Sequence, residues 1–257
     1  MIYQFPFGEE VRPLRQTDRS PKKVFVLGVY ASPVHANWVK GDDVIIEALP
    51  VANEPRLFWD GNEKEENEII SRIHIPEEMG VLKPAGERHN GPTASVLDEH
   101  ILAPLGVSRD EAWLCDCLNE ARLYPAQYKE IMDKYNPFVF DYNLNYSTIP
   151  KRPIVMCDRR RSMEITNEII ESQAELLVLL GDIAIGQFLN KAARVSYSSL
   201  NDYEEQYGYG IPSEAVIGGK YMEVLPLAHP RQIGVFGVYN EKWHYTHGQW
   251  EKKLKVR

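Results

Sequence analysis

Two short apolar runs that each end at a glycine constrain the fold of this chain more than any other feature. Residues 23–28 read Lys-Val-Phe-Val-Leu-Gly, and residues 175–181 read Glu-Leu-Leu-Val-Leu-Leu-Gly. An aliphatic and β-branched run of this length, bounded by a glycine, is typical of a strand that is buried on both faces. Such strands form the centre of parallel sheets, so the sequence predicts a parallel sheet.

Further strands and helices alternate with these two runs. Strands are predicted over 112–116 and 222–228. The Gly218-Gly219 pair predicts a hairpin that leads into the last strand, because two glycines supply the positive φ angles of a primed turn. Apolar residues at helical spacing predict helices over 92–105, 162–173, 182–189 and 239–254. This alternation favours an α/β fold with three layers, α/β/α, around a mainly parallel central sheet.

Length and composition favour one domain over residues 1–257, since 44% of the residues are apolar and α/β folds of this size are often single units. The segment 39–88 is interpreted as an insert. It contains a predicted strand at 43–49 and an acidic helix near 63–73, whose run Glu63–Glu66 is expected to be solvated. Apolar runs are too short for a bilayer, and the N-terminal residues do not form a signal peptide. A cytoplasmic protein without a membrane partner is expected.

The charge of the chain argues against non-specific duplex binding. The net charge is −8 and the isoelectric point is about 5.5, whereas such binders carry an excess of basic surface. The run Arg159–Arg161 is interpreted as a solvated loop before a helix. Cys115, Cys117 and Cys157 are expected to be reduced core thiols, too few for a four-thiolate centre. No metal and no cofactor are therefore expected.

Small and polar residues follow each predicted strand, at the end where ligands bind in doubly wound sheets. These segments are Gly28-Val-Tyr-Ala-Ser-Pro-Val-His, Asp116-Cys-Leu-Asn, Gly181-Asp and Ala228-His-Pro-Arg-Gln-Ile. In this order and at these places they resemble the motifs of the uracil-DNA glycosylase superfamily, over about residues 23–233. The resemblance implies a uracil-DNA glycosylase-type domain in a divergent member of that superfamily.

The resemblance implies a DNA glycosylase of base excision repair. Such an enzyme flips a deaminated or damaged, uracil-like base out of single- or double-stranded DNA and hydrolyses its N-glycosidic bond. His229 matches the family histidine that stabilises the leaving base. By position, Arg231 would contact phosphate and Ile233 would wedge into the DNA.

The first motif departs from the family pattern. The family has an acidic residue here that positions the attacking water. Alignment on Pro33 places Ser32 at that position, and alignment on Gly28 places Tyr30 there. Neither side chain carries a carboxylate, so a member of this kind would rely more on stabilising the leaving group.

Two residues after Pro33 complete the first motif. Val34 matches a position that is often aromatic and excludes larger bases, so a valine would make that wall less restrictive. His35 matches a family histidine, and a loop histidine with structural contacts is the alternative. The aromatic residues Trp38, Phe58 and Trp59 would stack on a base or, as we favour, pack against the protein.

The second motif has Asp116 where the family commonly has an asparagine that reads uracil. An ionised aspartate can only accept hydrogen bonds, so it would repel O4 of uracil at a cost of about 1–3 kcal/mol. Asp116 is therefore protonated, reads a base with an exocyclic amine, or activates water; a structural role in the following turn is the fourth alternative. Asn119 would contribute an amide to the base.

Two other functions remain open. The first is a binding protein that holds a nucleobase, nucleotide or nucleic-acid end without cutting it. The second is a metal-dependent hydrolase on the same sheet that uses acidic residues and a histidine, although these lack the spacing typical of a metal site. Its ligands would come from Asp42, Asp43, Glu54, Asp60 and His35.

Overall fold

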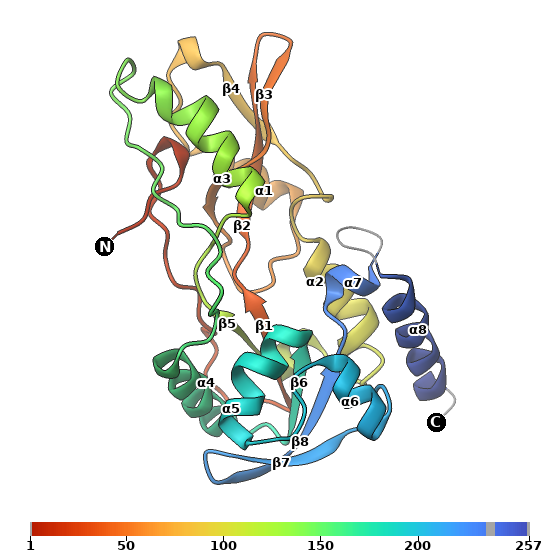
Figure 1. The fold of residues 1–257 in the computed structure, drawn as a ribbon. Helices are drawn as coiled ribbons and strands as arrows, with labels where there is room; N and C mark the ends of the chain where they lie inside the picture. The colour runs from red at the N-terminus through yellow and green to blue at the C-terminus, as the bar shows by residue number, and fades with distance from the viewer. Residues whose placement is uncertain (1, 235–239, 256–257) are drawn as a thin grey trace. The chain divides into compact units, whose positions relative to one another are not determined.

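A computed structural model describes residues 2–234 and 240–255 of the chain (Figure 1). The residues group by their contacts into two compact units. The parallel-sheet unit comprises Arg15–Tyr30, Thr93–Asn119 and Val155–Arg257. The antiparallel-sheet unit comprises Met1–Leu14, Ala31–Pro92 and Glu120–Ile154.

The parallel-sheet unit contains a five-stranded sheet in the order β5-β1-β6-β8-β7. The first four strands run parallel, and β7 pairs antiparallel with β8 at one edge. The two apolar runs identified from the sequence are β1 and β6, which are adjacent in the middle of the sheet. The strands are β1 (Val24–Tyr30), β5 (Ala112–Leu118), β6 (Leu176–Leu180), β7 (Ser213–Ile217) and β8 (Lys220–Leu227).

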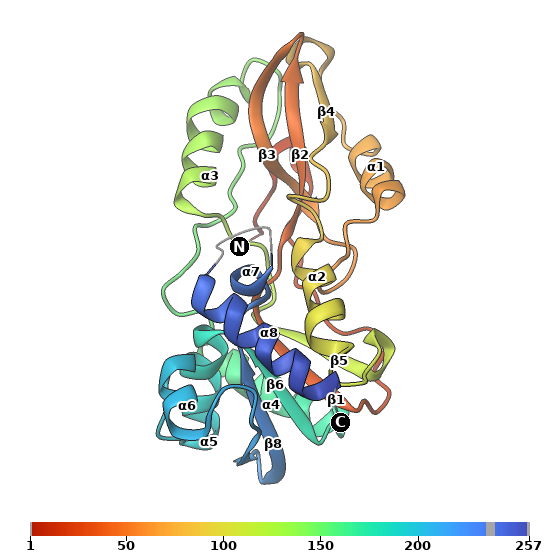
Figure 2. The same ribbon diagram turned by 90° about the vertical axis from the view of Figure 1, so that its right-hand side faces the viewer.

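Helices cover both faces of this sheet. Figures 1 and 2 show α4 on one face and α2 with α8 on the opposite face. Two helices include π-helical segments, Asp98–Leu102 after α2 and Ala184–Leu189 before α5. The helices of this unit are α2 (Pro92–Leu97), α4 (Arg159–Ser172), α5 (Asn190–Ala193), α6 (Leu200–Tyr207), α7 (Pro230–Ile233) and α8 (Glu241–Lys255).

The Gly-Gly turn forms as predicted. Gly218 and Gly219 have φ angles of 58° and 85°, and Ile217 pairs with Lys220 across the two-residue loop. Both angles lie in the left-handed region that favours glycine, and both are positive as in a type I′ turn. The turn therefore fixes the register of β7 against β8, and with it the position at which β8 ends.

The antiparallel-sheet unit is built on a second sheet, of three strands in the order β3-β2-β4. Both pairings in it are antiparallel. Helix α1 is capped by Asn62, the residue before its first turn, whose side chain accepts a hydrogen bond from the amide of Glu65. The elements of this unit are β2 (Pro33–Lys40), β3 (Asp43–Asn53), α1 (Glu63–Ser71), β4 (Val81–Pro84) and α3 (Pro125–Glu130).

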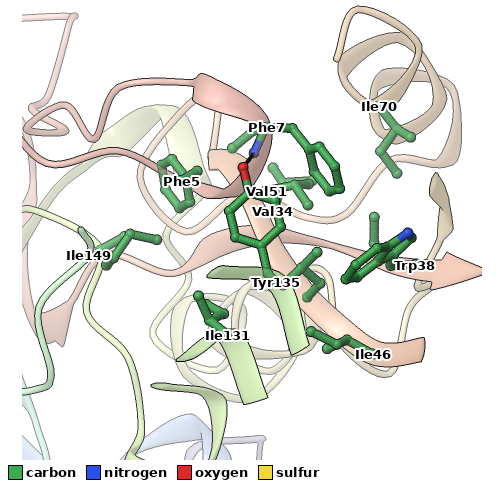
Figure 3. Close-up of a cluster of buried hydrophobic side chains, with 14 of the residues drawn as sticks. Phe5, Phe7, Val34, Trp38, Ile46, Val51, Ile70, Ile131, Tyr135 and Ile149 are labelled. Atoms are coloured by element: carbon green, nitrogen blue, oxygen red, sulfur yellow. Dashed lines mark hydrogen bonds between the residues drawn. The ribbon is translucent and has the colours of Figure 1, made fainter. Parts of the chain in front are cut away.

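Aromatic and aliphatic side chains form the core of the antiparallel-sheet unit (Figure 3). Phe7, Trp38 and Tyr135 make mutual edge contacts, with ring centroids 5.0–6.3 Å apart. The Tyr135 hydroxyl accepts from the Phe7 amide at 2.8 Å and donates to the Asn145 carbonyl at 3.0 Å. The only polar atom of this ring is thus satisfied inside an apolar cluster, which holds the N-terminal segment against β2.

The segment 39–88 contains the predicted strand and acidic helix, now seen as β3 and α1. It is not a separate excursion, because it packs in one unit with Met1–Leu14 and Glu120–Ile154. The expectation that the acidic run is solvated is wrong for Glu66, which is 1% exposed and accepts hydrogen bonds from Asn90 and the Gly86 amide. One domain over residues 1–257 stays a prediction.

The α/β fold and the mainly parallel central sheet are confirmed. Across the residues that the structure describes, no helix combines the length and the apolar character needed to span a bilayer.

Candidate functional site

The four segments singled out from the sequence follow strands whose ends lie level at one edge of the parallel sheet. Gly28 on β1 pairs with Asp116 on β5, and Leu180 on β6 pairs with Leu227 on β8. The connection that follows β1 leads to β5, the neighbour of β1 on one side. The connection that follows β6 leads in the opposite direction across the sheet, to β7 and β8. This divergence marks the place where open α/β sheets bind ligands.

Asp116 is a buried carboxyl group, with 4% of the residue exposed. Side chains alternate along a strand, and Cys115 contacts Arg161 of α4. The Asp116 side chain therefore points to the opposite face, the one covered by α2 and α8 (Figure 2). Burial raises its pKa to about 7, although the charge of Arg161 acts in the other direction. Near neutral pH, Asp116 is divided between the acid and the carboxylate.

Arg161 fixes the main chain at Asp116, a contact that the sequence analysis missed. Its guanidinium donates to the Asp116 carbonyl oxygen from Nε at 3.2 Å and from Nη2 at 2.8 Å. It also pairs with Glu164 and Glu168. The run Arg159–Arg161 forms the first turn of α4 and not a loop; Arg159 and Arg160 are exposed as expected, whereas Arg161 is buried. Asp158 caps that helix by accepting from the Arg161 amide.

His229 stands at the N-cap of α7, directly after β8. Its Nδ1 accepts a hydrogen bond from the Arg231 amide at 3.2 Å. Burial, followed by the charge of Arg231, lowers the pKa of His229 to about 4. The ring is therefore neutral at physiological pH, and because Nδ1 is an acceptor, its hydrogen is on Nε2. His229 presents a neutral N–H donor.

The end of β6 lies close behind His229. Gly181 has a φ angle of 79°, and a Cβ atom added to it would lie 3.2 Å from the Cβ of His229. That φ angle strains any residue with a side chain. The glycine after β6 therefore allows the His229 turn to lie against the edge of the sheet.

Helix α7 lies on the same face as the Asp116 side chain. It packs beside α8 (Figure 2), and a Cβ added to Gly234 at its end would meet Val96 of α2 at 2.7 Å. Strand axes are about 4.8 Å apart, so β5 and β8, three positions apart, are separated by about 14 Å. Asp116 and His229 thus lie at the carboxyl ends of the parallel strands and on the same face of the sheet. Asp116 is on β5, the first strand in the sheet order, and His229 follows β8, the fourth.

The other residues predicted in this unit differ in accessibility. Tyr30 is the last residue of β1 and is half-buried, like Arg231 in α7. Asn119 directly follows β5 and is 9% exposed. Ile233 is only 5% exposed, so its side chain packs inside the protein and is not presented as an exposed wedge.

The residues that follow Tyr30 belong to the antiparallel-sheet unit. Ser32 is exposed, while Pro33 begins β2, where it pairs with Asn53. The expectation that Val34 lines a ligand wall is wrong for this structure, because Val34 is 0% exposed and packs in the core of this unit (Figure 3). Alternating apolar residues from Val34 to Trp38 indicate this strand, and the motif interpretation overlooked them.

His35 is held in β2 by main-chain contacts. Its amide donates to Oδ1 of Asn90 at 2.9 Å, and its carbonyl accepts from Nδ2 of the same residue at 2.9 Å. Asn90 thus pairs with His35 as a neighbouring strand would, and it also donates to Glu66 at 2.8 Å. The ring Nε2 lies 3.2 Å from Nε2 of Gln127. These contacts support the structural alternative for His35, in a strand and not in a loop.

The three aromatic residues considered for base stacking pack inside the protein, as we favoured. Trp38 is 3% exposed, Phe58 9% and Trp59 1%. The indole nitrogen of Trp38 donates to the Met79 carbonyl at 2.6 Å, and that of Trp59 donates to Glu65 at 2.7 Å.

The cysteines are free and buried, as expected of core thiols. Within 2–234 and 240–255, no group of three or more His, Cys, Asp and Glu residues is placed to hold a metal ion. The metal-hydrolase alternative therefore gains no support from the acidic residues and the histidine that it invoked.

No protein-family model matches the chain, and no curated protein matches it either. The relationship to the uracil-DNA glycosylase superfamily therefore rests on the strand-end motifs and stays a prediction.

Proposed function

We propose that this chain is a uracil-DNA glycosylase-like enzyme that excises a deaminated or damaged base from DNA at the edge formed by Asp116 and His229. One observation carries the proposal. The two groups lie on one face and one edge of the sheet, and burial favours the neutral form of each. Between about pH 4 and pH 7 the edge offers a neutral carboxyl group and a neutral imidazole N–H.

A neutral Asp116 resolves the mismatch that the sequence raised. Its O–H donates to a base carbonyl and its C=O accepts from the adjacent ring N–H. Uracil, hypoxanthine and xanthine all present such a carbonyl and N–H side by side. The protonated alternative for Asp116 is therefore the one we adopt. With the proton on its other oxygen the group could also face cytosine, so undamaged cytosine belongs in the test.

His229 would act on the leaving base. When the C1′–N bond breaks, the electron pair leaves with the base, and negative charge develops on its carbonyl oxygens. A fixed, neutral N–H donor stabilises that charge without the desolvation cost of an imidazolium ion. A water molecule adds to C1′ and loses a proton to solvent, and the departing base takes one up. The sum is one water consumed for one base released.

The test is cleavage of oligonucleotides that contain uracil, hypoxanthine, xanthine or cytosine, single- and double-stranded, followed by alkali. The rate should be bell-shaped in pH, falling below about 4 as His229 is protonated and above about 7 as Asp116 ionises. His229→Ala should lower the rate by about 10²–10³-fold with an unchanged melting temperature. An absence of strand breaks with every base at micromolar protein would refute the proposal.

Binding without cleavage is the second candidate. One observation favours it: residues 29–40, the end of β1 and the segment that follows it, contain no carboxylate to position a water. A binder would show a thermal shift with free bases or nucleotides but no strand breaks. In that case His229→Ala would reduce affinity only.

A further inference from the structure

A chain of partly buried hydrogen bonds leads from the start of the His229 turn to helix α8. The Ala228 amide donates to the Tyr209 hydroxyl at 3.1 Å. That hydroxyl lies 2.6 Å from Nδ1 of His247, and Nε2 of His247 lies 2.8 Å from the carbonyl of His100. His247 is 1% exposed. Neither the Asp116 side chain nor the His229 side chain, which are proposed above to bind the base, takes part in these contacts.

When His247 is neutral, the chemistry of the two ends fixes every hydrogen in this chain. The Ala228 amide can only donate, so the Tyr209 oxygen accepts from it and its own hydrogen points to His247. The His100 carbonyl can only accept, so Nε2 of His247 carries the ring hydrogen and Nδ1 is bare. A protonated His247 would instead donate from Nδ1 to the Tyr209 oxygen, and the Tyr209 hydrogen would lose this acceptor. Burial lowers the pKa of His247 and raises that of Tyr209, in agreement with this assignment.

Helix α8 also holds the far end of the same turn. Nδ1 of His244, three residues before His247, lies 2.6 Å from the Ile233 carbonyl. The Asn240 amide donates to the Gln232 carbonyl at 3.0 Å. Two histidines of α8 thus hold opposite ends of the segment 228–233. His244 contacts the Ile233 carbonyl directly, and His247 reaches the Ala228 amide through the Tyr209 hydroxyl.

Other titratable groups around His247 are few and identified. Glu251, one turn later on α8, lies 3.7 Å from Nε2 and also pairs with Nδ1 of His100 at 2.9 Å. The ring of Trp250 lies 4.8 Å away between centroids, and the charges of His100 and His244 also act on the ring. Burial and the charges of His100 and His244 oppose protonation of His247, whereas its hydrogen bond to the His100 carbonyl and the charge of Glu251 favour it.

We infer that Tyr209 is a positioning residue for His229: its hydroxyl, oriented by neutral His247, fixes the main chain where the turn begins. The turn then holds Nδ1 of His229 against the Arg231 amide and leaves Nε2–H for a ligand. A role of Tyr209 in catalysis rests on the proposed function, whereas its role in positioning the His229 ring does not.

The test compares Tyr209→Phe with Tyr203→Phe. Tyr203 is a buried tyrosine of the same unit whose hydroxyl donates to the Ile211 carbonyl at 2.6 Å, so its loss is chemically matched but does not touch the turn. Imidazole NMR, with signals assigned through His229→Gln, reports the tautomer and pKa of His229. Tyr209→Phe should mix the tautomers and raise the pKa of His229 from about 4 toward 6.5. Tyr203→Phe should change neither.

Variants of His247 test the same chain if Tyr209→Phe does not fold. His247→Gln keeps an acceptor for Tyr209 and a donor for the His100 carbonyl, so it should preserve the His229 signals. His247→Leu keeps neither and should act like Tyr209→Phe. With a uracil oligonucleotide, Tyr209→Phe and His247→Leu should lower kcat at least 10-fold with little change in KM.

The outcomes separate the two proposals. Unchanged His229 tautomer and pKa in both Tyr209→Phe and His247→Leu would overturn the positioning role. An altered His229 in these variants, together with a wild-type protein that cleaves no oligonucleotide, would support the positioning role and refute the glycosylase.

Discussion

The two regions that carried the sequence motifs are built in different ways. In the antiparallel-sheet unit, Val34 and His35 are held by strand pairing and apolar packing. In the parallel-sheet unit, Asp116 and His229 are ionisable groups that burial displaces from their usual protonation states. Strongly displaced pKa values gather at functional sites more often than elsewhere. The second and fourth motifs, and not the first, therefore contain buried ionisable groups of the kind that functional sites use.

The largest effect is expected from Arg161→Met. Arg161 is 7% exposed, and its loss removes the ion pair of the buried Glu168 and both donors to the Asp116 carbonyl, at a cost of about 3–5 kcal/mol in unfolding free energy. The pKa of Asp116 should rise further, because Arg161 lowers it. Arg160→Met, one residue away with its side chain 87% exposed, is the control. Similar unfolding free energies for the two variants, in urea titrations, would contradict the role given to Arg161.

Asp116→Asn should change the pH dependence of stability. The pKa of Asp116 is about 7 in the folded protein and 3.8 ordinarily, so the folded state holds an extra proton between these values. Stability from this group is present below about pH 4 and is lost as pH rises to about 7. The asparagine variant lacks that loss, and at pH 8 it should be more stable by about 4 kcal/mol.

The same variant sharpens the proposal for Asp116. An amide presents a donor and an acceptor at every pH, so the alkaline limb of the cleavage profile should disappear. Equal pH profiles of unfolding for wild type and Asp116→Asn would show that Asp116 ionises normally, and the contrast between the two regions would fail.

Val34→Ala tests the other side of the comparison. Removing two methyl groups from a fully buried site should lower the unfolding free energy by about 2 kcal/mol. The pKa of Asp116, followed by carboxyl NMR, should not move. A displaced Asp116 titration in Val34→Ala would mean that the first motif acts on the site after all.

Ser32→Ala should have the smallest effect. Ser32 is exposed, and such substitutions usually change stability by less than about 0.5 kcal/mol. If Ser32 positions the attacking water, cleavage of a uracil oligonucleotide should instead fall by 10-fold or more. We expect a change of less than twofold.

Strand periodicity predicted the parallel sheet well. The apolar runs that became β1 and β6 and the Gly-Gly turn are local signals, and local sequence determines them. The division into two units was not predicted, because it depends on which distant segments pack together. At the site, the edge positions of Asp116 and His229 followed from the strand ends. Arg161 was missed because a basic run has the same composition on a solvated loop and in a buried first turn.

The alternation of the two units along the chain has a consequence for folding. The chain passes between the units at 14/15, 30/31, 92/93, 119/120 and 154/155. Residues 31–111 therefore separate β1 from its partner β5, and most of them belong to the antiparallel-sheet unit. Closing a loop of that length is slow when the loop is unstructured. When the antiparallel-sheet unit has already folded, the flexible chain that must close between β1 and β5 is shorter. Early folding of that unit would therefore accelerate the docking of β5 on β1.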